Sequence, residues 1–161
     1  MTTLVGRLRV PLAAADAFVL FTPLGERAWV HGWEPRFPRP VDDDTEPGTV
    51  FVTEAHGGST TWVVTARDRP RAISYARVTP GDRAGTVTVR LEPDGTTSLV
   101  EVVYDLTALA AESEADLKEF ADRYAAYLES WERDIAAYLS GPTQTTEEIR
   151  VGEVGKGGER R

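Results

Sequence analysis

The chain of 161 residues contains no cysteine, which excludes disulfide bonds, thiol nucleophiles and thiolate metal sites. It also has no apolar run that approaches the roughly 18 residues of a membrane-spanning helix. The first ten residues lack the apolar core of a signal peptide. We therefore expect a cytoplasmic protein.

Positive charge is scarce, because 18 Lys and Arg residues stand against 26 Asp and Glu residues and leave a net charge of -8. This balance argues against nucleic acid or an anionic membrane surface as a partner. A Gly-x-Ser-x-Gly nucleophile motif is missing too. The glycine-rich stretch 152–158 has Gly after its Gly-Lys pair, where a phosphate-binding loop needs Ser or Thr.

Histidine is almost as rare as cysteine, since only His31 and His56 are present. The two are far apart in the sequence. Without cysteine, this spacing offers no metal-ligand set, and we expect neither a metal nor another cofactor. His56 precedes two glycines in a predicted hairpin turn and should face solvent. The acidic run 42–44 lacks the spaced ligands of a calcium loop, so we interpret it as solvated charge.

The most regular pattern that is present predicts one long amphipathic helix, from about Leu117 to Leu139. Ser113, with Asp116 three residues later, resembles a capping box, and Gly141 followed by Pro142 is a strong stop. Apolar residues recur every three or four positions, as in one stripe of a 3.6-residue period. The stripe consists of Leu117, Phe120, Ala121, Tyr124, Leu128, Trp131, Ile135 and Leu139.

Strand-like alternation, broken by turns such as Pro93-Asp94-Gly95, fills most of the chain before this helix. The predicted strands cover residues 4–10, 49–55, 60–67, 72–79, 84–92 and 96–106, and a short edge strand covers 37–41. Two short helices, 13–21 and 24–30, follow the first strand.

The predicted fold class is therefore α+β, with a curved antiparallel sheet of about seven strands and a long C-terminal helix that covers one of its faces. One domain should span residues 1–141, and residues 142–161 should form a flexible tail because glycine and mixed charge replace apolar residues there. Space left between the sheet and the helix is where a ligand would bind.

Several short motifs follow one another in a characteristic order. They are Phe21-Thr22-Pro23, Glu26-Arg27, Trp29, His31-Gly32-Trp33-Glu34-Pro35, Pro47-Gly48-Thr49-Val50-Phe51, Thr61-Trp62, Ile73-Ser74-Tyr75, Tyr104 and Trp131. In this order the chain resembles, over residues 1–140, the START-like or helix-grip (SRPBCC) superfamily in its polyketide cyclase and dehydrase branch. The resemblance implies seven strands wrapped around the last helix with an apolar cavity between them. It also implies varied roles, from cyclases, dehydrases, lipid carriers and hormone receptors to co-chaperones, and no shared catalytic set.

Strand alternation and the helix stripe predict which side chains face this space. An inward Arg77 would need an anion, which a ligand carboxylate or enolate or an internal acid could supply. The alternative is that these side chains form a dry core. The predicted ligand-binding residues are Trp33, Trp62, Arg77, Val89, Val102, Phe120, Tyr124, Leu128 and Trp131.

His31, Tyr75 and Tyr104 are the candidate catalytic residues. His31 follows the second short helix and could exchange a proton near neutral pH, or it simply ends that helix and faces water. Tyr75 and Tyr104 could fix the polar end of a ligand, because a buried tyrosine hydroxyl usually has a hydrogen-bond partner, or they belong to the core.

We predict that the chain binds a small hydrophobic or aromatic molecule. One hypothesis is an enzyme for cyclisation, dehydration or aldol-type chemistry without a metal, and a second is a non-catalytic carrier or sensor. A third is a co-chaperone-like interaction module. Convergent polar groups around a roomy pocket would favour the enzyme, a closed apolar cavity the carrier, and a filled interior with an exposed apolar patch the module. The oligomeric state is open, a homodimer included.

Overall fold

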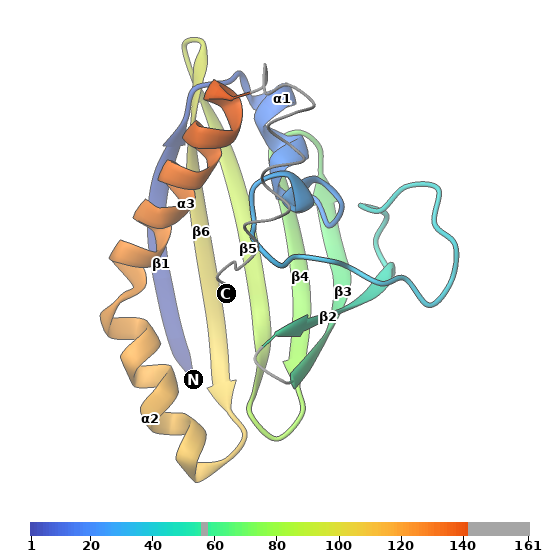
Figure 1. The fold of residues 1–161 in the computed structure, drawn as a ribbon, viewed down its shortest axis with the longest axis vertical. Coiled ribbons are helices and arrows are strands. Elements are labelled where there is room, and N and C mark those ends of the chain that lie inside the picture. Colours follow the sequence, from blue (N-terminus) through green and yellow to red (C-terminus); the bar gives the residue numbers. More distant parts are fainter. Residues whose placement is uncertain (56–57, 142–161) are drawn as a thin grey trace.

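The computed structural model describes residues 1–55 and 58–141 and shows an α+β fold around one curved antiparallel sheet (Figure 1). Within the described residues the sheet has six strands, in the order β1-β6-β5-β4-β3-β2. Their bounds are β1 Thr2–Val10, β2 Val50–Ala55, β3 Gly58–Asp68, β4 Ala72–Thr79, β5 Arg83–Asp94 and β6 Thr97–Ala108.

The predicted seventh strand at residues 37–41 is wrong. Only Arg36 meets the sheet there, through an isolated bridge in which its backbone N donates to the Val52 carbonyl and its carbonyl accepts from the Val52 N, both at 2.9 Å. Pro38 and Pro40 have no N–H group and cannot extend this ladder. The segment therefore covers one point of the β2 edge and then leaves the sheet.

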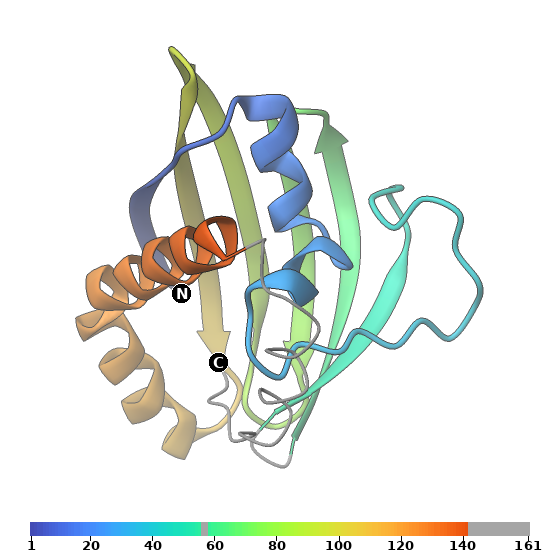
Figure 2. The same cartoon turned by 45° about the horizontal axis from the view of Figure 1, so that its top comes forward.

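The two short helices after β1 are present but shorter than predicted. The first is α1, Ala14–Phe18, and it continues as the 3₁₀ turn η1, Val19–Phe21. The second is only a 3₁₀ turn, η2, Gly25–Ala28. Together they cover the inner face of β3, β4 and β5 at one end of the sheet, as Figures 1 and 2 show. This end of the interior is therefore closed.

The predicted long C-terminal helix is present, but its continuity is wrong, because it is broken into α2, Ala111–Asp122, and α3, Tyr124–Ser140. Arg123 stands between them with φ -108° and ψ 13°, outside helical geometry. The helix begins before Ser113, which is buried in the first turn, and no side chain caps its N-terminus. The predicted capping box is therefore not formed.

The helical arm formed by α2 and α3 lies along β1 rather than across the middle of the sheet (Figures 1 and 2). Gly6 allows this close approach, because a Cβ atom at Gly6 would lie 2.4 Å from Leu128 Cδ1 and 3.0 Å from Tyr124 Cε2. A side chain at position 6 would have to displace the side chains of Leu128 and Tyr124. The arm therefore leaves the middle of the sheet to other elements.

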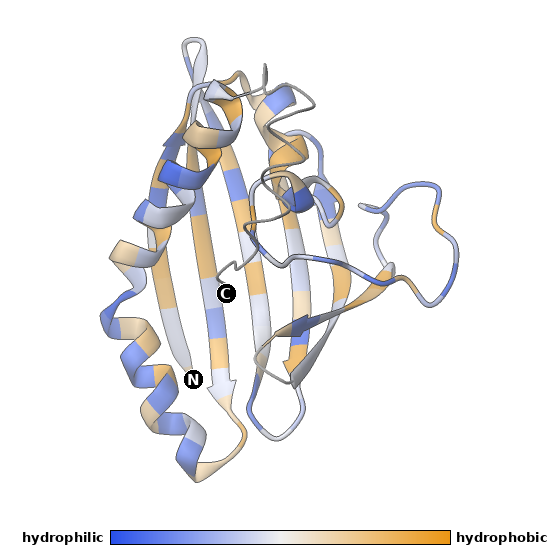
Figure 3. Ribbon diagram, viewed as in Figure 1, coloured by the Kyte–Doolittle hydropathy of each residue, from blue (hydrophilic) through white to orange (hydrophobic). Residues whose placement is uncertain are grey.

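The alternation predicted for the central strands is confirmed. Val100, Val102, Tyr104 and Leu106 of β6 are buried, and so are Val87, Val89 and Leu91 of β5. Register brings these two sets together, with Val87 opposite Tyr104 and Val89 opposite Val102. Figure 3 shows the same contrast along the chain, with apolar residues recurring in the strands and much of α2 hydrophilic.

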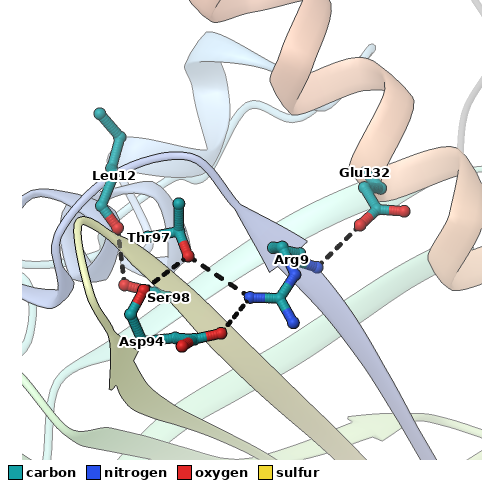
Figure 4. Close-up of polar contacts among 6 residues, drawn as sticks. All are labelled: Arg9, Leu12, Asp94, Thr97, Ser98 and Glu132. Atoms are coloured by element: carbon teal, nitrogen blue, oxygen red, sulfur yellow. Dashed lines mark hydrogen bonds and ion pairs between the residues drawn. The ribbon is translucent and has the colours of Figure 1, made fainter.

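The outer edge of β1 is partly covered by α3 (Figure 4). The backbone N of Arg9 donates to Glu132 Oε2 at 2.8 Å. The Arg9 guanidinium meanwhile pairs with Asp94 in the β5–β6 hairpin. Next to it, Ser98 Oγ donates to the Leu12 carbonyl at 2.7 Å and ties this hairpin to the segment after β1.

Two predictions fall outside the described residues, namely the exposed His56 in its hairpin turn and the flexible tail 142–161. Among the helices that are described, none has the length and apolar character to cross a membrane.

Candidate functional site

An open cleft of about 820 Å³ lies between the helical arm and the ends of β2, β3 and β4. At this end of the sheet α1, η1 and η2 do not cover the inner face, and the helical arm stays near β1 (Figure 2). The cleft is lined by His31, Gly32, Trp33, Thr53, Glu54, Ala55, Gly58, Thr60, Trp62, Arg77, Thr79, Pro80, Asp82, Arg83, Tyr104, Asp116, Glu119, Phe120, Arg123 and Tyr127.

The sheet wall of the cleft is built on one row of cross-strand neighbours. Phe51 stands opposite Trp62 and their rings stack, with centroids 5.7 Å apart, while Trp62 also stands opposite Arg77. The Arg77 guanidinium carbon lies 5.2 Å from the centroid of the Trp62 ring, within the range of a cation–π contact. Trp33, from the loop after η2, packs edge-on against Trp62 at 5.6 Å.

Hydrogen bonds hold this wall in place. Trp62 Nε1 donates to Thr53 Oγ1 at 2.9 Å, and Trp33 Nε1 donates to the Pro23 carbonyl at 2.7 Å. Arg77 Nη2 donates to Thr79 Oγ1 at 2.9 Å. The rings and the guanidinium therefore present fixed faces to the cleft, with little side-chain freedom left to lose when a ligand binds.

The opposite wall comes from the helical arm and β6. Phe120 and Tyr127 are half-buried, their ring centroids are 5.1 Å apart, and Tyr104 lies 5.6 Å from Phe120. All three rings meet edge to face, an arrangement that aromatic pairs prefer. Two walls of aromatic rings thus face the same open space.

Charged residues surround the mouth of the cleft and are largely paired with one another. Arg83 Nε lies 2.9 Å from Asp82 Oδ2, and Arg123 Nη2 lies 3.9 Å from Glu119 Oε2. Glu54 accepts from Ser59 Oγ at 2.9 Å and pairs with Arg36. The hydrogen bond from Ser59, helped by the one from Arg36, lowers the pKa of the Glu54 carboxyl, which is therefore ionised at neutral pH.

The other end of the interior is packed solid. Trp131 lies in a cluster of rings, with its centroid 5.3 Å from that of Trp29 and 6.4 Å from that of Phe21. The rings of Tyr75 and Tyr124 pack against the cleft-wall residues Trp62 and Phe120. The Tyr75 hydroxyl donates to the Phe21 carbonyl at 2.8 Å, and the Tyr124 hydroxyl donates to the Val102 carbonyl at 2.7 Å. Burial, with a smaller effect from Tyr127, raises the pKa of the Tyr124 hydroxyl, so it stays protonated.

The structure brings together about half of the residues predicted for the site. His31, Trp33, Trp62, Arg77, Tyr104 and Phe120 line the cleft. Tyr75, Val89, Val102, Tyr124, Leu128 and Trp131 are buried but are not among the residues that line it. His31 is exposed at the mouth, so it faces solvent and the cleft together.

Tyr127 is the main residue that the sequence analysis missed. It stands seven positions after Phe120 and four before Trp131, so helical spacing placed it beside the predicted stripe. The threonines of the sheet wall, Thr53, Thr60 and Thr79, were also missed. Their small polar side chains give no signal in an alternating strand pattern.

The described residues contain no group of three or more His, Cys, Asp or Glu side chains arranged to hold a metal ion. The acidic run is used structurally. Asp43 Oδ1 accepts from Thr45 N and Oγ1, its other oxygen pairs with Arg67, and Asp44 Oδ2 accepts from the Leu24 backbone N. The hydrogen bonds from Thr45 and the contact with Arg67 lower the pKa of Asp43 to about 2.

A smaller hollow of about 400 Å³ lies elsewhere and is less suited to an apolar ligand. Three arginines line it, Arg7, Arg71 and Arg90, together with the acids Asp68, Glu92 and Glu101. It has no aromatic lining, and Arg7 and Arg71 are already paired with acids. The aromatic cleft is therefore the candidate site.

Comparison with known proteins places the chain by its sequence and its fold. The model of a family described as polyketide cyclase / dehydrase and lipid transport matches residues 1–135. No curated protein sequence matches the chain.

Solved structures similar to this one share little sequence with it and thus show the fold alone. CalU16 from Micromonospora echinospora is 16% identical with a TM-score of 0.61, over 94% of this chain and 81% of that one. DynU16, from the dynemicin biosynthetic locus, is 12% identical with a TM-score of 0.62, over 86% of this chain and 47% of that one. The Aha1 dimer from Colwellia psychrerythraea is 14% identical with a TM-score of 0.57, over 82% of this chain and 94% of that one.

Proposed function

Since the chain belongs to the polyketide cyclase / dehydrase and lipid transport family, we propose that it binds a small planar aromatic molecule in the cleft between β2–β4 and the helical arm. The observation that carries this proposal is the lining itself. Five aromatic rings line the cleft, and the described lining includes no Leu, Ile, Val or Met. The five rings are those of Trp33, Trp62, Tyr104, Phe120 and Tyr127.

This lining favours an aromatic ligand over a saturated chain. Aromatic side chains prefer offset-stacked or edge-to-face contacts with other rings, which a flat ligand provides and a flexible chain does not. The volume of about 820 Å³ falls within the range of small-molecule sites. Arg77, held on the face of Trp62 and bonded to Thr79, supplies a cation for a carboxylate or enolate oxygen of the ligand.

A second candidate function is catalysis on such a ligand, of the cyclisation or dehydration type. His31, Arg77 and Tyr104 line one roomy cleft together, and this convergence of polar groups supports an enzyme over a closed apolar carrier. His31 would move a proton at the mouth, and Arg77 would stabilise the negative charge of an enolate. The cytoplasmic location stays a prediction from the sequence.

Binding can be tested with two probes, 2-naphthoate and dodecanoate, followed by the indole N–H signals of the four tryptophans in a two-dimensional NMR titration. Trp33 and Trp62 line the cleft, whereas Trp29 and Trp131 lie in the packed end. We expect 2-naphthoate to shift the first two signals while the other two stay in place, and dodecanoate to bind at least several-fold more weakly. Tighter binding of dodecanoate, or equal shifts of all four signals, would contradict the proposal.

The role of Arg77 is tested by Arg77→Leu, which should weaken 2-naphthoate binding by roughly tenfold or more, because a hydrogen bond to a charged group contributes about 1.5–3 kcal/mol. Arg90→Leu is the matched control, since Arg90 is exposed and does not line the cleft. Equal losses in the two variants would show a general charge effect and remove Arg77 from the site.

A further inference from the structure

Tyr127 occupies a special position at the junction of the two parts of the helical arm. It lies in the first turn of α3, where its backbone N donates to the carbonyl of Arg123 at 2.9 Å. Arg123 is the residue that breaks the helix. The break thus sets the direction in which the first turn of α3 presents its side chains, and Tyr127 lines the cleft together with Phe120 from α2.

The Tyr127 ring is fixed by its neighbours. Its centroid lies 5.1 Å from that of Phe120, 5.4 Å from Trp131, 6.2 Å from Tyr124 and 6.5 Å from Tyr104. Contacts on several sides leave the ring little rotational freedom. The position of its hydroxyl is therefore set by packing before any ligand binds.

The hydroxyl of Tyr127 differs from those of Tyr75 and Tyr124. Tyr75 and Tyr124 donate their hydroxyl protons to the backbone carbonyls of Phe21 and Val102. Within residues 1–55 and 58–141, no group forms a hydrogen bond with the Tyr127 hydroxyl. A tyrosine hydroxyl usually has a hydrogen-bond partner, and because Tyr127 lines the cleft, a molecule bound there can supply it in place of water.

We propose that the Tyr127 hydroxyl donates a hydrogen bond to an oxygen acceptor on the bound aromatic molecule, so that the cleft selects planar aromatic ligands that carry a carbonyl group. This inference rests on the proposed function, because it needs an aromatic ligand in the cleft. It adds a second polar contact to that of Arg77, on the opposite wall, and it makes Tyr127 a residue that determines specificity.

The test compares two flat probes of nearly equal shape, 2-acetylnaphthalene and 2-isopropenylnaphthalene, in which a carbonyl oxygen is exchanged for a methylene group. For the unaltered protein we expect the ketone to bind about five- to tenfold more tightly, as one net hydrogen bond allows. Tyr127→Phe keeps the ring and should abolish this preference, while affinity for the hydrocarbon stays unchanged. Tyr138→Phe, on the exposed end of α3, is the matched control and should keep the preference.

The outcomes separate this inference from the proposed function. If the unaltered protein binds both probes with equal affinity, or if Tyr127→Phe retains the preference for the ketone, the role of Tyr127 is overturned while aromatic binding stands. If neither probe shifts the Trp33 and Trp62 signals, the proposed function fails and this inference fails with it.

Discussion

The two ends of the interior contain the same kinds of residue, but at one end their rings are packed together and at the other they line an open cleft. At the packed end, Trp29, Trp131 and Phe21 form one cluster, and Trp29 Nε1 donates to the Leu20 carbonyl at 2.8 Å. At the open end, Trp33 and Trp62 face a cleft of about 820 Å³. Both ends are rich in aromatic rings, so aromatic content alone does not distinguish a core from a binding site.

What differs is the element that covers the sheet. Phe21 and Trp29 come from η1 and the end of η2, and they fill the space beneath α3 at the packed end. At the open end of the described interior the helical cover consists of α2, whose buried residues are Ser113 and Leu117, and of the first turn of α3, which contributes Tyr127. Most of the apolar stripe of the helical arm is therefore buried, and it meets the cleft at the half-buried Phe120.

The largest expected effect would come from removing a ring of the packed end. Trp131→Ala should lower the free energy of unfolding by about 3–5 kcal/mol, because it leaves a cavity among rigid neighbours. Phe120→Ala, at the half-buried cleft wall, should cost only about 1–2 kcal/mol. Urea denaturation of both variants measures the difference. Equal losses would mean that the two ends are packed alike and would remove the basis of the comparison.

A smaller effect is expected where the helical arm touches β1. Gly6→Ala should destabilise the protein by about 1–3 kcal/mol, because the new Cβ overlaps Leu128 at the foot of α3. Adding Leu128→Ala to this variant should cost less than Leu128→Ala alone costs in the unaltered protein, since the two residues share one space. Gly58→Ala is the control, as the nearest atom to its Cβ would be 3.8 Å away. Additive losses would show that the arm adjusts freely over β1.

The smallest effect concerns the acidic loop, which lies outside both ends. The pKa of Asp43 is lowered to about 2 from 3.8, so its contribution is present above about pH 4 and is lost as the pH falls towards 2. Because the side chain is 44% exposed, we expect less than about 1 kcal/mol. Stability of Asp43→Asn, measured by urea denaturation between pH 2 and 6, should match the unaltered protein at the acid end and fall below it at pH 6. A constant difference would assign the effect to packing.

Much of the fold could be predicted from the sequence, because strand alternation is a direct consequence of burying one face. The β4 boundaries were predicted as they stand, and the inward set on β5 and β6 was correct. The strand predicted at residues 37–41 was placed at a sheet edge because Pro38 and Pro40 cannot donate to a ladder, and for the same reason the segment does not pair as a strand. The alternation of apolar side chains indicates which face of a strand is buried, whereas strand pairing also requires backbone N–H donors, which proline lacks.

The site was less predictable, because its position depends on how far the helices extend over the sheet. No proline or glycine marks the break at Arg123, and the apolar stripe runs through it without interruption. The single long helix was therefore the natural prediction, and with it a hollow along its whole length. Tyr75 and Tyr124 were placed beside that hollow, but both hydroxyls donate to backbone carbonyls. In the part of the chain that the structure describes, the cleft lies at one end of the helical arm.

The contacts at the two borders of the sheet also bear on how copies of this chain could associate. An incoming strand at β1 would have to displace Glu132 from the Arg9 amide, and one at β2 would have to displace Arg36 from Val52. Each contact removes a docking point for strand addition, the usual route by which sheet proteins polymerise. A homodimer built by joining two sheets into one is thereby disfavoured, and self-association would have to use another surface.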